Sequence, residues 1–172
     1  MNKTKKLVLI SLFISQALVL SIIESWITLP IPVPGVKLGL ANIITLIVII
    51  FFSFKEALIV VIMRTMLSSI FGGGGLIVFL FSCAGGVLST VVMAGLHKVK
   101  HDVFSIVGIS VAGAAAHNIG QVLVAALIMK DMAVIALLPL ILTFGSIMGI
   151  LVGIVSGFLE DKLKRSKIFD LY

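Results

Sequence analysis

The run Leu7-Val-Leu-Ile-Ser-Leu-Phe-Ile-Ser-Gln-Ala-Leu-Val-Leu-Ser-Ile-Ile-Glu-Ser-Trp-Ile-Thr-Leu29 is apolar apart from a few small polar residues and one carboxylate, Glu24. A helix needs about 20 apolar residues to cross a bilayer. The run is longer than the apolar region of an ordinary signal peptide, and no small-residue cleavage site precedes Glu24. It therefore predicts a retained first transmembrane helix.

The composition of the whole chain agrees with this prediction. The 172 residues are 60% hydrophobic and 12% charged, whereas a soluble domain carries about 25% charged residues. The length suits one compact bundle, so we predict a single domain over residues 1–172. The lone cysteine, Cys83, excludes an internal disulfide and suggests no cysteine-based metal site. No metal ion or cofactor is predicted.

The apolar segments predict an all-α fold, a polytopic membrane bundle of six transmembrane helices. Their expected ranges are 7–29, 38–54, 57–71, 76–96, 103–129 and 133–159. If the N-terminus is cytoplasmic, the inner segments hold ten of the thirteen Lys and Arg residues. The positive-inside rule therefore predicts that both the N- and C-termini are cytoplasmic. The short basic clusters favour membrane orientation over nucleic-acid binding.

Several polar residues interrupt these apolar segments. They are Glu24, Asn42, Arg64, His117, Asn118 and Gln121. A charged side chain in the middle of a bilayer is costly, and such residues usually face a bundle interior or a water-filled cavity. With the predicted orientation, all of them fall in the middle or outer part of their spans. This indicates a pocket that opens outward; the alternative is that the groups only satisfy one another between helices.

Helical spacing groups the same residues into shared faces. Residues three, four and seven positions apart lie on one side of a helix. The predicted faces are Ser21, Glu24, Ser25 and Thr28; Arg64 and Ser68; and Gly113, His117, Gln121 and Ala125.

The segment before the second span is rich in proline and glycine. Pro30, Pro32 and Pro34 favour an extended chain, and Lys37 lies just before a helix start, where free N–H groups attract anions. Lys37, Arg64 and Glu24 together carry a net charge of +1. We therefore expect a mild preference for an anionic ligand.

Small residues recur at intervals of four on three spans. These faces are Ser82, Gly86, Thr90 and Ala94; Gly108, Ala112, Ala116 and Gly120; and Gly145, Gly149, Gly153 and Gly157. Such faces allow close helix packing in lipid, and we expect most of them to pack within the chain. Ser11 and Ser15, near the cytoplasmic end of the first span, are candidates for contact with a partner membrane subunit.

The sequence contains no motif typical of an enzyme of phosphate or acyl chemistry. It lacks an aspartate-rich diphosphate site, a G-x-S-x-G elbow and a Walker A lysine motif. We therefore expect a protein that is not an enzyme, and energised transport would need other subunits.

Four stretches carry a family resemblance. They are Pro34-Gly-Val-Lys-Leu-Gly-Leu-Ala-Asn-Ile43, Arg64-Thr-Met-Leu67, Ser82-Cys-Ala-Gly-Gly-Val-Leu-Ser89 and Gly113-Ala-Ala-Ala-His-Asn-Ile-Gly-Gln121. Together they resemble the Gx transporter family, also labelled heptaprenyl diphosphate synthase component I. That family is similar to the substrate-binding S components of energy-coupling factor (ECF) transporters, which are six-helix bundles that capture vitamins or precursors from outside.

The resemblance implies a place in a bacterial cytoplasmic membrane, together with a transmembrane coupling subunit and two cytoplasmic ATPases. It also implies that the ligand region comprises Lys37, Asn42, Arg64, His117, Asn118 and Gln121. S components usually contact the coupling subunit through an A-x-x-x-A face on the first helix. Here the equivalent small residues are Ser11 and Ser15.

Two functions follow as expectations. The first is an S component that captures a small anionic precursor of the vitamin, quinone or isoprenoid type. The second is a non-catalytic membrane subunit or scaffold associated with prenyl diphosphate or menaquinone synthesis. An autonomous ion channel is disfavoured because a through-pore needs polar lining along its whole length.

Overall fold

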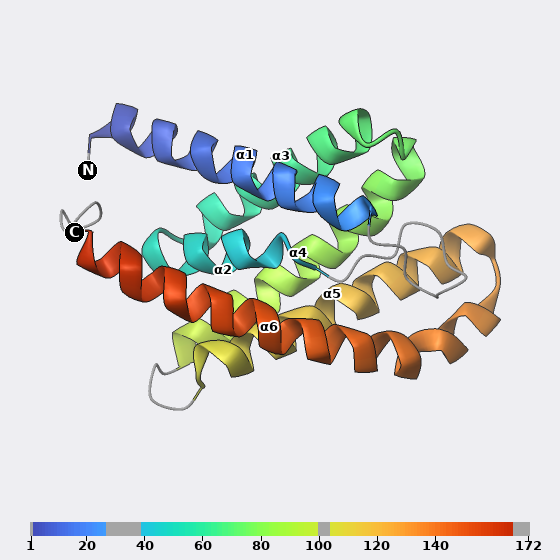
Figure 1. Cartoon of the computed structure of the whole chain (residues 1–172). Coiled ribbons are helices and arrows are strands. Elements are labelled where there is room, and N and C mark those ends of the chain that lie inside the picture. Colours follow the sequence, from blue (N-terminus) through green and yellow to red (C-terminus); the bar gives the residue numbers. More distant parts are fainter. Residues whose placement is uncertain (1, 27–38, 100–103, 167–172) are drawn as a thin grey trace.

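A computed structural model describes residues 2–26, 39–99 and 104–166. Within these ranges the chain forms six α-helices and one 3-10 helix, with no β-strand (Figure 1). The elements are α1 (Lys3–Trp26), α2 (Asn42–Phe51), α3 (Phe54–Phe71), α4 (Gly75–Val99), α5 (Ile106–Met129), η1 (Met132–Leu137) and α6 (Leu138–Arg165). The predicted all-α bundle of six helices is confirmed.

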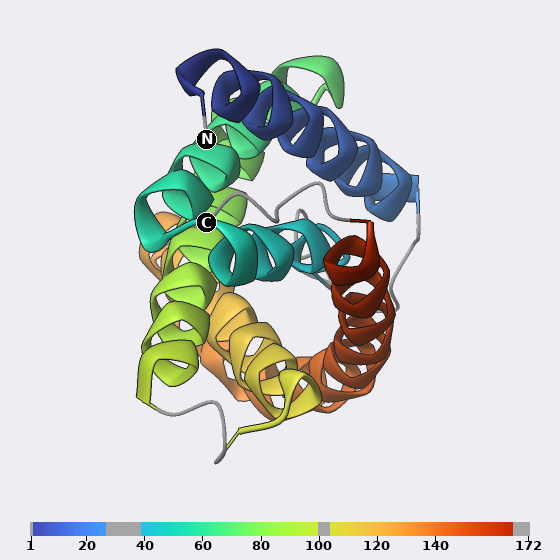
Figure 2. The ribbon, with the colours of Figure 1, turned by 90° about the vertical axis from the view of Figure 1, so that its left-hand side faces the viewer.

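The short helix α2 occupies the centre of the bundle. It contacts each of the other five α-helices, and Figure 2 shows it lying between α1 and α6. Its residues from Asn42 to Ile49 are all buried. The sequence Asn-Ile-Ile-Thr-Leu-Ile-Val-Ile-Ile-Phe is rich in β-branched residues, which favour strands in water. In a membrane the backbone must satisfy its own hydrogen bonds, so the helix is the available structure.

The described helices differ in their capacity to cross a membrane. Four are long and apolar enough: α1, α4, α5 and α6 with its preceding η1. At about 1.5 Å per residue, the ten residues of α2 span about 15 Å, half of a hydrocarbon core of ~30 Å. The predicted span 38–54 is therefore longer than the helix. The chain enters α2 through Gly39 at φ +90, and leaves it at Ser53, which caps α3.

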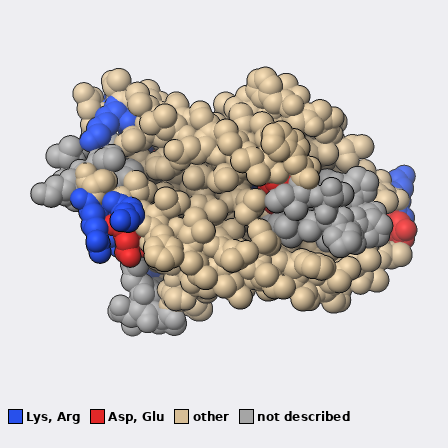
Figure 3. Space-filling view, viewed as in Figure 1, with Lys and Arg blue, Asp and Glu red and all other residues tan. Residues whose placement is uncertain are grey.

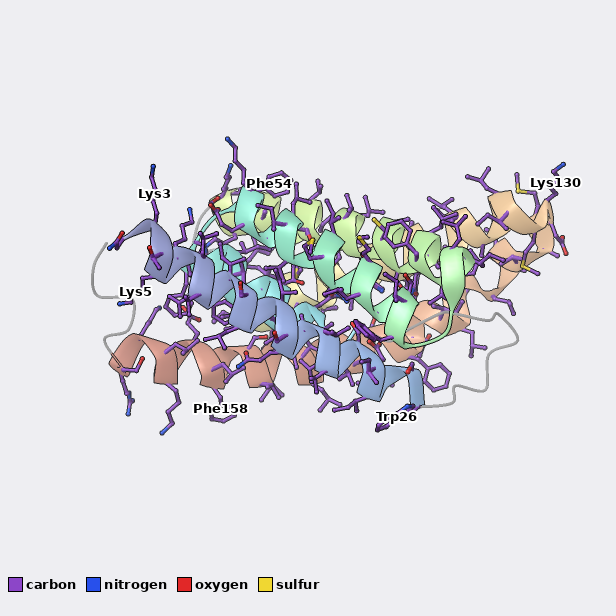
Figure 4. The ribbon with its side chains drawn as sticks, turned by 90° about the horizontal axis from the view of Figure 1, so that it is seen from above. Lys3, Lys5, Trp26, Phe54, Lys130 and Phe158 are labelled. Atoms are coloured by element: carbon purple, nitrogen blue, oxygen red, sulfur yellow. The ribbon has the colours of Figure 1, made fainter. Side chains whose placement is uncertain are left out.

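Charge gathers at one end of the bundle, which we call the basic end. It carries both described chain ends and the residues Lys3, Lys55, Lys98 and Lys162. Figure 3 shows Lys and Arg side chains at this end and a largely uncharged surface between the two ends. Lys130 lies at the opposite end in Figure 4. This distribution agrees with the predicted orientation, in which the basic end is cytoplasmic.

The connection between α2 and α3 differs from the prediction. The predicted spans 38–54 and 57–71 leave Lys55 and Glu56 between two helices, but both residues lie in the first turn of α3. Ser53 accepts a hydrogen bond from the Lys55 N–H at 3.3 Å, and its hydroxyl donates to the Glu56 carboxylate. A Ser with a Glu three residues later is a capping pattern that starts a helix. The turn is therefore confined to Phe52 and Ser53.

Glycines bring α6 close to α5. A Cβ at Gly149 would lie 2.9 Å from the Val111 Cα, and one at Gly153 would lie 2.6 Å from the Val107 Cα. Such close backbone approach is how helices associate in lipid. At Gly157 nothing lies within 4 Å of an added Cβ. The predicted packing role of this glycine series is thus confirmed for Gly149 and Gly153, but it does not extend to Gly157.

Candidate ligand-binding site

Arg64 is the centre of a buried polar cluster formed by α1, α2 and α3. Its side chain is 3% exposed. One terminal nitrogen, Nη1, donates to the Ser21 hydroxyl at 3.1 Å, and the other, Nη2, donates to the Asn42 Oδ1 at 3.3 Å. A guanidinium carries five N–H donors, and among the described residues its Nε has no partner. The cluster therefore retains donor capacity for an anionic group.

Glu24 joins the same cluster from the outer end of α1. It is 4% exposed, and it accepts a hydrogen bond from the Gly39 N–H, which ties α1 to the start of α2. Its carboxylate also attracts the guanidinium of Arg64. Glycine is required at position 39, because φ is +90 there and an added Cβ would lie 2.8 Å from the Asn42 Nδ2.

Two adjacent glycines of α4 separate this cluster from a second one on α5. A Cβ at Gly86 would lie 3.3 Å from the Arg64 Nη2. A Cβ at Gly85 would lie 2.9 Å from the Gln121 Cγ and 3.2 Å from the His117 Cδ2. The glycine pair thus lets polar side chains approach α4 from both sides. The helical spacing predicts Gly86 on a packing face, but it does not indicate a place in the site for either glycine.

His117 and Gln121 share one buried face of α5, as the spacing predicted. They are 2% and 0% exposed, and Gly113 and Ala125 of the same predicted face are also buried. On the facing helix α4, the hydroxyls of Ser82 and Ser89 are buried and have no partner among the described residues. These two serines are further candidates for ligand contact. Their spacing in the sequence could have indicated this, because residues seven positions apart, such as Ser82 and Ser89, lie on one face of a helix.

Asn118 lies on a different side of α5 and faces α6. Its Nδ2 donates to the Ile141 carbonyl at 3.1 Å, and a Cβ at Gly145 would lie 1.9 Å from that nitrogen. The structure therefore does not bring Asn118 together with His117 and Gln121. Its role as a ligand residue stays a prediction.

The remaining predicted residues divide into four groups. Ser68 is buried one turn after Arg64, so the predicted shared face of α3 is confirmed. Ser25 is exposed and donates to the Ile22 carbonyl at 2.6 Å, so its predicted place on the buried face of α1 is wrong. Lys37, Thr28 and the three prolines lie outside the described residues. Ser11 and Ser15 are exposed on α1, where the Ser15 hydroxyl donates to the Ser11 carbonyl at 3.0 Å.

The fold and this site define a class: a helical membrane protein with charged and polar side chains buried between its spans. The family can also be stated. The family model described as heptaprenyl diphosphate synthase component I matches residues 13–159, and the chain belongs to that family. No curated protein and no solved structure matches this chain.

Proposed function

We propose that the protein is the substrate-capturing S component of an ECF-type uptake transporter in a bacterial cytoplasmic membrane. It is proposed to be non-catalytic and to bind a small anionic precursor of the vitamin, quinone or isoprenoid type from outside. The observation that carries the proposal is the buried Arg64, whose two hydrogen-bond acceptors are both neutral. A buried cation of this kind is costly in a membrane and is usually functional.

Each part of the site has a chemical role in this proposal. Arg64 binds the anionic group of the ligand, while Ser21 and Asn42 hold the guanidinium in place. Gln121 and His117 contribute hydrogen bonds from the α5 side. The Glu24–Gly39 hydrogen bond positions the chain at the outer end of the site.

The proposal also assigns partners. A pocket of this kind binds but does not move its ligand across the membrane, so transport requires a coupling subunit and two cytoplasmic ATPases. The exposed Ser11 and Ser15 of α1 are the proposed contact for the coupling subunit, because their small side chains allow a second helix to approach closely.

Native mass spectrometry of the protein purified from membranes tests the pocket. We expect a co-purified small molecule whose occupancy falls strongly in Arg64→Ala and in His117→Ala. Lys55→Ala, an exposed cation on the same helix as Arg64, serves as the matched control and should retain the molecule. Unchanged occupancy in both site variants would contradict the pocket assignment. Absence of a coupling subunit and ATPases from mild-detergent complexes would contradict the transporter role.

A second candidate function is favoured by the family's description. In this alternative the protein is a non-catalytic membrane subunit or scaffold for prenyl diphosphate or menaquinone synthesis. It predicts co-purification with a soluble prenyl synthase, whereas the S-component proposal predicts co-purification with ATPases. Mass spectrometry of the same complexes distinguishes the two.

A further inference from the structure

A cavity, which we call the basic cavity, opens at the basic end of the bundle between α2, α3 and α4. Its volume is about 430 Å³, within the range of about 300–1,000 Å³ that is typical of small-molecule sites. Its three basic lining residues are Lys55, His97 and Lys98. Apart from Ser53 the other lining residues are apolar, namely Ile49, Ile50, Phe52, Phe54 and Ala94. Figure 4 shows Phe54 in the half of the bundle that carries Lys3.

The two lysines of the basic cavity have no counter-ion in the described chain. Lys55 and Lys98 are exposed, and no described residue forms an ion pair or a hydrogen bond with either side chain. No carboxylate is among the described lining residues. Glu56, which is next to Lys55 in sequence, is already engaged by Lys6 of α1 and by the Ser53 hydroxyl. The basic cavity therefore presents two uncompensated positive charges to a ligand.

Helix dipoles explain only part of this charge. His97 and Lys98 belong to the last turn of α4, where the negative end of the helix dipole favours cations. Lys55 is the second residue of α3, at the positive end of that helix, where a cation is disfavoured. Residues that break a local rule of this kind often do so at functional sites. An anion in the basic cavity would be attracted by Lys55 and by the start of α3 together.

The basic cavity lies at the boundary between the membrane interior and the head-group layer. The 25 residues of α4 extend about 37 Å, more than a hydrocarbon core of ~30 Å, so His97 and Lys98 at its end reach the head groups. Toward the membrane interior, the exposed residues Gly95 and Val91 continue the helix face that carries Lys98. Nothing lies within 4 Å of a Cβ added at Gly95. A bound molecule thus meets cations at one end and an open, apolar surface at the other.

We propose that the basic cavity binds an anionic phospholipid from the leaflet at the basic end, with its phosphate beside Lys55 and Lys98. The glycerol and the upper part of the acyl chains then contact Phe52 and Phe54. Basic pockets between transmembrane helices on the cytoplasmic side bind anionic lipid head groups in this way. An acidic segment of a soluble partner has the charge but not the apolar part, so the lipid is the better fit to this lining.

This lipid site is separate from both surfaces of the proposed transporter. Arg64 lies nine residues after Lys55, which is about 13 Å further along α3. No described residue of α1, which carries Ser11 and Ser15, lines the basic cavity, and in the described chain α1 makes no contact with α4. Variants of Lys55 should therefore lose the lipid and keep the captured ligand, whereas Arg64→Ala should do the reverse.

Phosphatidylglycerol is the probe that tests the lipid site. Native mass spectrometry of the full chain in detergent measures its affinity, with phosphatidylcholine as the zwitterionic comparison. Lys55→Gln and Lys98→Gln should each weaken phosphatidylglycerol binding about fivefold, and together about 25-fold, because each lysine near an anionic surface contributes about that much. Phosphatidylcholine binding should not change. All the substituted lysines are exposed, so the variants should fold.

A charge-matched variant separates this site from the general positive charge of the basic end. Lys3→Gln combined with Lys162→Gln removes two exposed cations from the same end of the bundle but from outside the basic cavity. This double variant should bind phosphatidylglycerol nearly as well as the unmodified protein. Equal losses in the two double variants would show a diffuse surface attraction and would overturn the proposal.

Phe54→Ala tests the apolar part of the site. It removes a half-buried ring from the lining and should weaken phosphatidylglycerol severalfold, while inorganic phosphate, which has no apolar part, should be unaffected. Phe158→Ala is the matched control, because Figure 4 shows that side chain projecting away from the bundle. The lipid should also raise the Tm of the unmodified protein more than that of the Lys55→Gln and Lys98→Gln double variant.

Two further outcomes would overturn the choice of occupant. The first is inorganic phosphate binding as tightly as phosphatidylglycerol, with the same loss in the Lys55→Gln and Lys98→Gln double variant, which would make the cavity a site for a free anion. The second is unchanged phosphatidylglycerol binding in that double variant together with loss of a cytoplasmic protein from mild-detergent complexes. That result would make the cavity a docking site for an acidic partner segment.

Discussion

At the scale of single residues, glycine positions decide which polar side chains can be buried. Gly85 and Gly86 admit the α5 cluster on one side of α4 and Arg64 on the other. Gly145 of α6 likewise leaves room for the Asn118 side chain of α5. A larger side chain at any of these positions would occupy the space of a hydrogen-bonding group. These glycines are therefore part of the polar interior as well as of helix packing.

Gly145→Ala tests this argument. The added Cβ would lie 1.9 Å from the Asn118 Nδ2, so Asn118 must move and lose its hydrogen bond to the Ile141 carbonyl. We expect a destabilisation of about 1–3 kcal/mol, the cost of leaving a buried polar group unsatisfied. Gly157→Ala is the matched control on the same helix. With nothing within 4 Å of its added Cβ, it should stabilise by about 0.5–1 kcal/mol because alanine favours the helix. Unfolding by a denaturing detergent measures both, and equal effects would contradict the argument.

At the scale of helices, the sequence predicted which helices exist and which of their faces are buried better than it predicted where each helix begins and ends. The interval of four residues correctly placed His117 and Gln121 on one buried face of α5. It failed for Ser25, because the C-terminal turn of α1 leaves that side chain to bond its own backbone. The start of α3 was missed because Lys55 and Glu56 are charged, although Ser53 and Glu56 form a capping pair.

The site could be predicted only in part for a related reason. Periodicity assigns residues to faces of one helix, but it does not say which helix a face meets. Asn118 and His117 are neighbours in sequence, yet they face α6 and α4 respectively. The central position of α2 was also beyond prediction, because an apolar run of that length reads like any other short span. Contacts between helices were the missing information.

The contact between α1 and α3 at the basic end should depend on pH. Burial raises the pKa of Glu56. Hydrogen bonds from Lys6 and Ser53, together with the charge of Lys6, lower it by a larger amount, so the pKa lies below its ordinary value of 4.5. A carboxylate with a lowered folded-state pKa stabilises the fold above its unfolded pKa, and this stability is lost as pH falls through the folded value. Because Lys6 is 40% exposed, we expect a contribution of only about 0.2–1 kcal/mol.

Glu56→Gln tests this contact. At pH 7 the variant should be less stable than the unmodified protein, and the difference should shrink as pH falls below about 4.5. Thermal unfolding in detergent at pH 3 to 7 measures the difference. Lys3→Gln removes a cation from the same end of α1 and should show no such convergence. A difference that persists unchanged to pH 3 would show that Glu56 acts through packing rather than through its charge.

At the scale of the whole molecule, charge and helix length together define how the bundle sits in the membrane. The described N- and C-terminal ends lie at the basic end, and the surface beyond it is largely uncharged (Figures 1 and 3). Only four described helices are long and apolar enough to cross by themselves, and α2 is held inside them. The polar cluster around Arg64 thus lies toward the opposite end of the bundle from most of the cations. The proposed capture from outside depends on this orientation.

Single-cysteine labelling tests the orientation directly. In a Cys83→Ala background, Met132→Cys and Phe71→Cys place thiols at the end opposite the basic end, where the native side chains are 72% and 70% exposed. A membrane-impermeant maleimide should label both in intact cells, because the positive-inside rule puts this end outside. Lys3→Cys and Lys98→Cys should react only after the membrane is permeabilised. The reverse pattern would turn the Arg64 cluster toward the cytoplasm, and capture from outside would then be excluded.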